Sequence, residues 1–171
     1  MNEPKIIKLN SFSDDRGVFT KVFDKFSIWK DFDFSKINIS SNAKKGTVRG
    51  LHIQKIPFQE IKVIKCTRGS LVDFCVDLRV NSKNYKKVYE FSLNEKDNYL
   101  LYIPKGFAHG FQTLANNTDL LYFHDQDYKP NEEIGINIQD EDLNIKFPLK
   151  ISVISQNDKE LPILKNKSNE M

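Results

Sequence analysis

The sequence of 171 residues is poor in histidine and cysteine, with three and two of them respectively. His52, His109 and His124 show neither His-x-His nor His-x-x-x-His spacing. A metal site needs two or three imidazoles and a carboxylate that converge at bonding distance, so no metal site is predicted. Cys66 and Cys75 lie in apolar runs, and we expect them to be reduced thiols in the core of a cytosolic protein.

Long apolar runs and charge of one sign are absent as well. No stretch approaches the ~20 apolar residues of a membrane span, and the N-terminus lacks the apolar core of a secretory signal. Lys and Arg number 26 against 23 Asp and Glu, and the two signs are interspersed, unlike the gathered basic face of a nucleic-acid-binding protein. No glycine-rich run opens a helix after a strand. We expect a cytoplasmic protein that binds neither membranes nor nucleic acids.

Short runs rich in Val, Ile, Phe and Tyr, separated by turn residues, predict a β-rich chain. The expected strands are residues 4–9, 18–23, 36–42, 47–53, 61–67, 70–78, 86–92, 99–103, 109–114 and 119–124. Residues 24–32 are the best helical segment. No repeat or linker is visible, so residues 1–171 are interpreted as one domain. About ten short strands with few helices predict an all-β sandwich or jelly roll, with short peripheral helices and an interior pocket.

Several polar side chains interrupt the apolar strands and are candidates for that pocket. A regular strand places Arg49 on one face, with Leu51 and Ile53, and His52 on the other. Lys62 alternates with apolar residues, and Tyr122 lies in an apolar run. Taken singly, each also fits an ordinary structural role, as a strand histidine, a half-exposed lysine or a core aromatic.

Taken in chain order, the motifs are more specific. They are DRGVF at 15–19, RGLHIQ at 49–54, KVIKC at 62–66, RGSLVD at 68–73, IPKGFAHGF at 103–111, LY at 121–122, YKP at 128–130 and SQND at 155–158. This series resembles the dTDP-4-dehydrorhamnose 3,5-epimerase family, a branch of the cupin jelly rolls. The resemblance covers nearly the whole chain and implies a cupin-type fold.

The resemblance also implies catalytic roles. His52 matches the general base that takes a proton beside a ketone, and Asp158 matches its carboxylate partner. Tyr122 matches the acid that returns a proton to the opposite face, and Lys62 matches the cation that faces the enolate oxygen. Base, opposed acid and cation are the minimum set for epimerisation, so no cofactor is expected.

Further residues match substrate-binding positions of the family. Those expected at the diphosphate, in the pocket or near the nucleoside are Arg16, Arg49, Asn38, Gln54, His109, Tyr128, Lys21 and Lys36. Family members are dimers whose opening strands reach into the neighbouring site. A homodimer is therefore expected, with Arg16 serving the other subunit.

Two of these positions depart from the family pattern. Lys21 stands where a Glu is usual, and Lys36 stands where a Gln is usual. Ammonium groups in place of a carboxylate and an amide change the donors and acceptors offered to a base. This favours guanosine diphosphate as much as thymidine diphosphate, unless both lysines are merely solvated.

The expected function is epimerisation at C3, C5 or both of a nucleotide-diphosphate 4-keto sugar, for surface polysaccharide biosynthesis. The candidate substrates are a GDP-linked 4-keto heptose or 6-deoxyhexose and a dTDP-4-keto-6-deoxyhexose. One alternative is a cupin sugar 3,4-ketoisomerase, which shifts the carbonyl. Another is a non-catalytic sugar-binding cupin.

Overall fold

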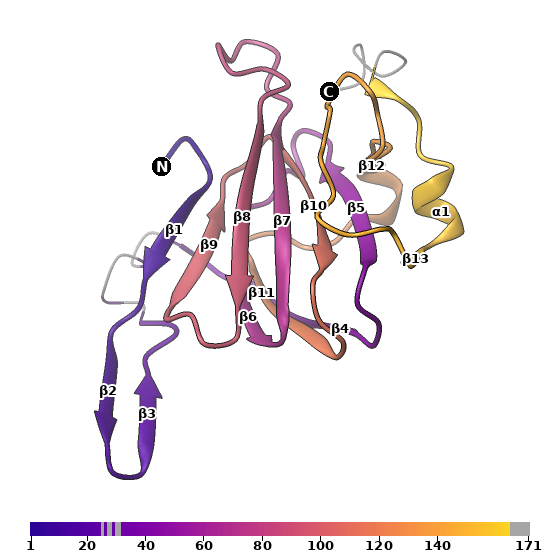
Figure 1. Ribbon diagram of the computed structural model, residues 1–171. Coiled ribbons are helices and arrows are strands. Elements are labelled where there is room, and N and C mark those ends of the chain that lie inside the picture. The colour runs from indigo at the N-terminus through magenta and orange to yellow at the C-terminus, as the bar shows by residue number, and fades with distance from the viewer. Residues whose placement is uncertain (25, 27–28, 30–31, 165–171) are drawn as a thin grey trace.

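In the computed structural model, which describes residues 1–24, 26, 29 and 32–164, two antiparallel sheets face each other (Figure 1). The first sheet has the strand order β1 (Lys5–Lys8), β9 (Tyr99–Ile103), β6 (Lys62–Arg68), β11 (Thr118–His124), β4 (Lys36–Asn42). The second has the order β12 (Glu133–Gly135), β5 (Thr47–Gln54), β10 (Phe107–Thr113), β7 (Ser70–Asp77), β8 (Val88–Asn94), and β13 (Val153–Ile154) joins β5 in parallel. The predicted all-β sandwich is confirmed.

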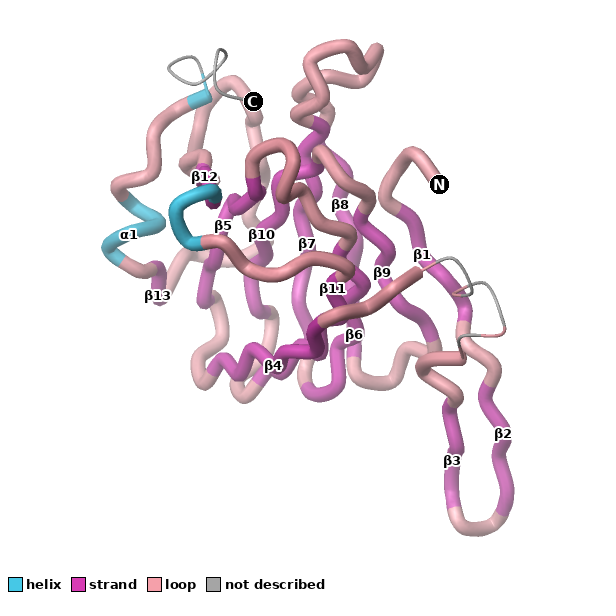
Figure 2. Tube along the Cα trace, turned by 180° about the vertical axis from the view of Figure 1, so that it is seen from behind, coloured by secondary structure: helices cyan, strands magenta, loops and turns pink. Residues whose placement is uncertain are grey.

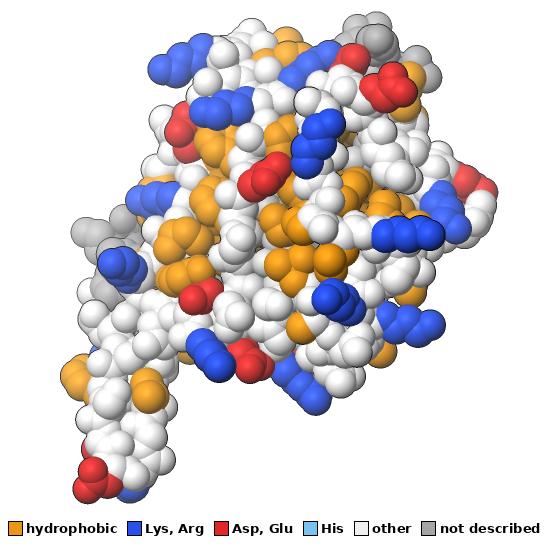
Figure 3. Space-filling model, viewed as in Figure 1, with side chains coloured by type: hydrophobic (Ala, Val, Ile, Leu, Met, Phe, Trp, Pro, Cys, Tyr) orange, Lys and Arg blue, Asp and Glu red, His pale blue; other side chains and the backbone are white. Residues whose placement is uncertain are grey.

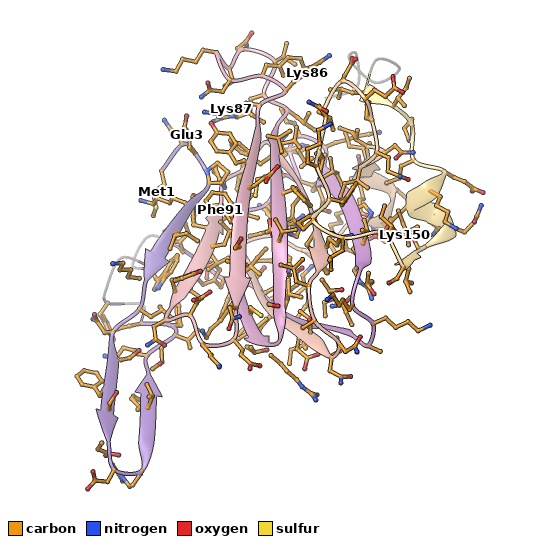
Figure 4. All side chains as sticks on the ribbon, in the orientation of Figure 1. Met1, Glu3, Lys86, Lys87, Phe91 and Lys150 are labelled. Carbon is orange, nitrogen blue, oxygen red and sulfur yellow. The ribbon has the colours of Figure 1, made fainter. Side chains whose placement is uncertain are left out.

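Apolar side chains from both sheets pack together in the core of the sandwich, and Figure 4 shows the side chains on the ribbon. Strand alternation sends every second residue inward, so Ile64 and Leu120 of the first sheet meet Leu71 and Phe111 of the second in one buried cluster. Cys66 belongs to this cluster, as does Cys75. Both thiols are buried and free, as predicted, and burial raises the pKa of Cys66 to about 11.

The outward faces of both sheets are covered by other parts of the chain. Trp29, Phe32 and Phe34 pack over Phe123 and its neighbours on the first sheet. The segment after β12 packs Ile136 and other aliphatic residues on the second sheet. The central strands are therefore buried on both faces, which explains their nearly continuous apolar runs.

A hairpin of β2 (Ser11–Asp14) and β3 (Gly17–Thr20) projects from the sandwich (Figures 1 and 2). Its side chains Phe12, Val18 and Phe19 are exposed, and orange apolar atoms appear on this arm in Figure 3. Arg16 lies in the turn, where Nε donates to Asp14 Oδ2 at 3.0 Å. The hairpin thus presents apolar side chains and a guanidinium away from the body of its own chain.

The remaining elements are short. The described helices are η1 (Pro130–Glu132) and α1 (Gln156–Lys159), as expected for peripheral helices. Of the predicted helix 24–32, residues 25, 27–28 and 30–31 lie outside the described residues. In the part of the chain that the structure describes, no helix has the length and apolar character needed to cross a membrane.

Strand β5 is irregular at Gly50, and this corrects the predicted facing of its side chains. On β10, His109 is opposite His52 and Phe111 is opposite Arg49, so Gly50 and its successor together face one residue. This extra residue is a β-bulge, which resets the alternation. Arg49 and His52 consequently line the same cavity, although a regular strand would place them on opposite faces.

The bulge predicts a large effect for Gly50→Ala. Gly50 has a φ of +105°, and an added Cβ would lie 2.6 Å from both the Gly110 Cα and the His109 carbonyl oxygen. We expect a loss of about 1–3 kcal/mol in the free energy of unfolding from the backbone alone, and more from the clash. Urea unfolding measures it. The matched control is Gly17→Ala, because Gly17 also has a positive φ but open space around its Cβ. Equal losses in the two variants would contradict a role for close packing.

Candidate active site

One cavity of about 790 Å³ lies between the two sheets. Polar side chains from both sheets and from α1 line it. Nine of the twelve residues singled out in the sequence are among them: Lys36, Asn38, Arg49, His52, Lys62, His109, Tyr122, Tyr128 and Asp158. The fold thus gathers residues that are more than 120 positions apart in the chain.

His52 and Asp158 form a pair on the wall made by the second sheet. Ser155 is the N-cap of helix α1, and its hydroxyl accepts from the Asp158 backbone N–H at 3.0 Å. This cap helps to place the Asp158 carboxylate beside β5. Its Oδ1 lies 2.9 Å from His52 Nε2, and its Oδ2 accepts from the Gly50 N–H at 3.2 Å.

The charge of the Asp158 carboxylate determines which nitrogen of the His52 imidazole carries a proton. Burial acts to raise the pKa of Asp158, but the hydrogen bonds from His52 and from the Gly50 N–H outweigh it and lower that pKa. An ionised carboxylate only accepts hydrogen bonds, so Nε2 of His52 carries the proton. In the neutral ring this leaves the lone pair of Nδ1 free to accept a proton.

Tyr122 stands on the other wall, on β11 of the first sheet. Its ring stacks on His124 with a centroid distance of 5.8 Å and meets the edge of His109 at 6.0 Å. Burial and the nearby carboxylate of Asp73 raise the pKa of Tyr122 well above its ordinary value, against the opposing charge of Arg49. The phenol therefore keeps its proton at neutral pH.

Lys62 faces the cavity from β6, the strand next to β11. Its Nζ lies 3.4 Å from Glu60 Oε1, while His124 Nδ1 lies 2.8 Å from the other oxygen, Glu60 Oε2. Burial acts to raise the pKa of Glu60, but the contacts with His124 and Lys62 lower it overall. The cation is thus held by an ionised carboxylate at the edge of the cavity.

His109 is paired as well. Its Nε2 lies 2.7 Å from Oδ2 of the fully buried Asp73, whose Oδ1 accepts from the Cys75 thiol at 3.5 Å. Each of the three histidines therefore faces a different carboxylate. Within the described ranges, no group of three or more His, Cys, Asp and Glu side chains is placed to hold a metal ion.

The remaining cavity residues form a basic and aromatic region. Arg49 Nε donates to Asn42 Oδ1 at 2.9 Å. The Lys36 ammonium lies 5.6 Å from the centre of the Tyr128 ring, a distance typical of a cation–π contact. Asn38 is opposite Tyr122 in the register of β4 and β11. An arginine with a lysine over an aromatic ring suits a phosphorylated ligand with a flat base.

Three predicted site residues lie elsewhere. Arg16 is at the turn of the projecting hairpin, and its side chain is 91% exposed. Lys21 pairs with Asp24 at 3.2 Å outside the cavity. Gln54 is 1% exposed, and its buried amide donates to the Asp127 carbonyl and accepts from the Lys129 N–H. Gln54 therefore supports the loop that carries Tyr128, and does not line the cavity itself.

Asp73, His124 and Glu60 are among the residues of the cavity or its support that sequence reasoning missed. The available signal for Asp73 was its polarity within an apolar strand. His124 shares the strand and parity of Tyr122, which would have placed both on one face. Glu60 precedes β6 and gave no local signal, because its partner His124 is 64 positions away.

The chain is similar to known proteins over nearly its whole length. A family model described as dTDP-4-dehydrorhamnose 3,5-epimerase matches residues 1–166. The chain is 37% identical over 166 residues to the dTDP-4-dehydrorhamnose 3,5-epimerase of Sinorhizobium fredii, covering 95% of this chain and 85% of the relative. It is 30% identical over 156 residues to the dTDP-4-dehydrorhamnose 3-epimerase of Streptomyces niveus, covering 89% and 75%.

The structural likeness is equally extensive. The crystal structure of dTDP-4-dehydrorhamnose 3,5-epimerase from Bacillus anthracis strain Ames, with TDP and PPi bound, matches with a TM-score of 0.91 at 35% identity, over 94% of each chain. This likeness confirms the predicted cupin-type fold. Because the family model, the sequence relatives and the solved structure all span nearly the whole chain, the protein belongs to the dTDP-4-dehydrorhamnose 3,5-epimerase family.

Proposed function

We propose that this protein epimerises a nucleotide-diphosphate 4-keto-6-deoxyhexose at C3, at C5 or at both carbons, without a cofactor. The observation that carries the proposal is the placement of His52 and Tyr122 on facing sheets of one cavity, with Lys62 on the strand next to Tyr122. A sugar ring between the two walls has a base on one face and an acid on the other.

The first step is removal of a proton from the carbon beside the ketone. Nδ1 of His52 accepts this proton, and Asp158, 2.9 Å from Nε2, stabilises the imidazolium that forms. Imidazole suits this task because its pKa ordinarily lies near neutral pH, where a base is both unprotonated and strong enough.

The enolate that forms needs a positive partner for its oxygen. Lys62 is the candidate, because its largely buried ammonium faces the cavity. In a site that excludes water, a fixed cation at a developing oxyanion contributes several kcal/mol to lowering the barrier. This contribution is the main reason that a weakly acidic C–H bond can be broken at neutral pH.

Inversion then requires a proton from the opposite face. Tyr122 is protonated at neutral pH, for the reasons given above, and stands on the sheet that faces His52. Return of the proton by His52 alone would regenerate the original configuration. The phenol therefore determines whether a carbon is inverted or only exchanged.

The nucleotide is assigned to the basic and aromatic part of the cavity. Arg49 supplies a guanidinium for the diphosphate, and Lys36 and Tyr128 stand where a base can stack. The names of the relatives favour a dTDP sugar, as does the TDP in the Bacillus anthracis structure. A GDP sugar is the second candidate, and the observation in its favour is the ammonium of Lys36, which presents donors where the family has an amide.

The projecting hairpin supports a homodimer. Its exposed Phe12, Val18 and Phe19 would be covered by a second copy, and Arg16 would then reach the neighbouring cavity to bind the diphosphate. We further propose that residues 1–171 act as one domain, that the enzyme works in the cytoplasm, and that its product is used for surface polysaccharide.

Incubation in heavy water tests the proposal. Across a panel of dTDP- and GDP-linked 4-keto sugars, we expect uptake of one or two deuterons from one nucleotide series, measured by mass spectrometry. NMR of the product then shows inverted carbons. A moved carbonyl would favour a ketoisomerase, and binding without uptake from any sugar would favour a non-catalytic cupin; either result would contradict epimerisation.

A further inference from the structure

One of the two carboxylate–histidine pairs that the mechanism above does not use, Glu60 with His124, also contacts Lys62. Glu60 lies between two cavity residues, with Oε1 at 3.4 Å from Lys62 Nζ and Oε2 at 2.8 Å from His124 Nδ1. The side chains of all three are about nine-tenths covered: 9% of Glu60, 11% of Lys62 and 10% of His124 is exposed. This arrangement is separate from the His52–Asp158 pair, which belongs to the other sheet.

The backbone around Glu60 is also fixed. The N–H of Ile61 donates to Asp125 Oδ1 at 2.7 Å, and Asp125 in turn pairs with Lys105 at 3.0 Å. Asp125 directly follows His124, so this contact joins the segment before β6 to the end of β11. The backbone next to Glu60 is therefore fixed by a hydrogen bond, and its carboxylate is directed at the His124 ring.

Lys62 needs such a partner. A lysine side chain has a flexible stem of four carbons and a compact charge, and its ammonium assists an oxyanion only when it is held at the right place. Among the described residues, Glu60 is the one carboxylate in ion-pair distance of Lys62. The register of β6 and β11 places Lys62 directly opposite His124. The Glu60 carboxylate therefore bridges two side chains that are neighbours across the strands.

His124 also contacts Tyr122, the proposed acid, through the face of its ring. Its ring stacks on Tyr122 with a centroid distance of 5.8 Å and an interplanar angle of 14°. The carboxylate accepts from Nδ1–H, which fixes the orientation of the imidazole. The same ring thus anchors the partner of the cation and packs against the phenol.

We propose that Glu60 and His124 are positioning residues that hold the Lys62 ammonium at the enolate oxygen. The inference rests on the proposed function, because the role of Lys62 at the enolate oxygen is part of that proposal. Glu60 acts through Lys62 and does not itself touch the sugar. Removal of the Glu60 carboxylate should slow enolate formation. Nucleotide binding should be unchanged, because other residues of the cavity provide it.

A double-mutant cycle tests this role. Glu60→Gln is expected to lower kcat for deuterium uptake about 10- to 100-fold with KM changed little, since misplacement of about 1 Å is enough for such a loss. In a Lys62→Met background, Glu60→Gln should lower kcat no further, because the ammonium that Glu60 is proposed to hold is absent. Glu90→Gln, at an exposed site on β8, is the control and should match the wild type.

Two outcomes would overturn the positioning role: full activity of Glu60→Gln, or equal losses from that change with and without Lys62. If Glu60→Gln fails to fold in a thermal unfolding assay, His124→Gln takes its place in the same cycle, with the same criteria.

A readout independent of turnover separates this inference from the proposed function. In ¹⁵N-labelled wild type, the His124 Nδ1–H should give a protected downfield proton signal, assigned by its loss in His124→Gln and absent in Glu60→Gln. If the wild type turns over a sugar but shows no such signal, only the positioning role fails. If the signal is present and no sugar shows exchange, the proposed function fails, and the role of Lys62 with it.

Discussion

Replacing His52 with asparagine is expected to lower the rate of deuterium uptake by about 10²- to 10⁴-fold, the usual contribution of a general base. Asparagine fills a similar volume and keeps a polar contact with Asp158, but it has no group that accepts a proton from carbon. Nucleotide affinity should change little, because the diphosphate and base are assigned to Arg49, Lys36 and Tyr128. Exchange by mass spectrometry and binding by calorimetry measure the two effects separately.

His109→Asn provides the comparison, since it also removes a histidine that is paired with a carboxylate in the same cavity. That variant should bind the sugar nucleotide more weakly and still exchange protons at saturating substrate. Loss of both exchange and binding in His52→Asn would refute the base assignment, because it would show that the cavity itself had changed.

The second large effect is expected from Tyr122→Phe. This variant should still take up deuterium, because His52, Asp158 and Lys62 are intact, but it should fail to invert at least one carbon. Without the phenol, the imidazolium of His52 returns a deuteron to the face from which it took the proton. NMR of the product measures configuration and isotope content at each carbon together.

The control for this experiment is Tyr99→Phe. Tyr99 is on β9, and its hydroxyl donates to the Ser92 carbonyl at 2.9 Å, away from the cavity. This variant should invert its substrate normally. Normal inversion by Tyr122→Phe would instead show that Tyr122 is a core aromatic whose hydroxyl has no part in the reaction.

The strands were largely predictable because their signal is local. Apolar and β-branched residues recur with period two and are interrupted by turns, and this pattern gave every strand of the two sheets that borders the cavity except β12. β12 and β13 are three and two residues long, too short for a periodic signal. β2 was missed because its four residues, SFSD, contain a single apolar side chain.

Site residues that lie in a sequence motif could be predicted, whereas residues placed only by the pairing of distant strands could not. The family motifs brought His52, Lys62 and Tyr122 to attention, and the series SQND did the same for Asp158. The facing of Arg49 could not be read from alternation, since the bulge at Gly50 depends on pairing with a distant strand. Glu60 was missed for a similar reason, because its hydrogen bond with His124 forms only when β6 and β11 pair.

Because His52 and Tyr122 stand on different sheets, no backbone hydrogen bond between strands fixes the distance between them. That distance is set by the aliphatic and aromatic side chains packed between the sheets, among them Ile64, Leu71 and Leu120. Leu120 is two residues from Tyr122 on the same face of β11. Substitutions among these core residues are therefore expected to shift His52 relative to Tyr122, even when every side chain that lines the cavity is unchanged.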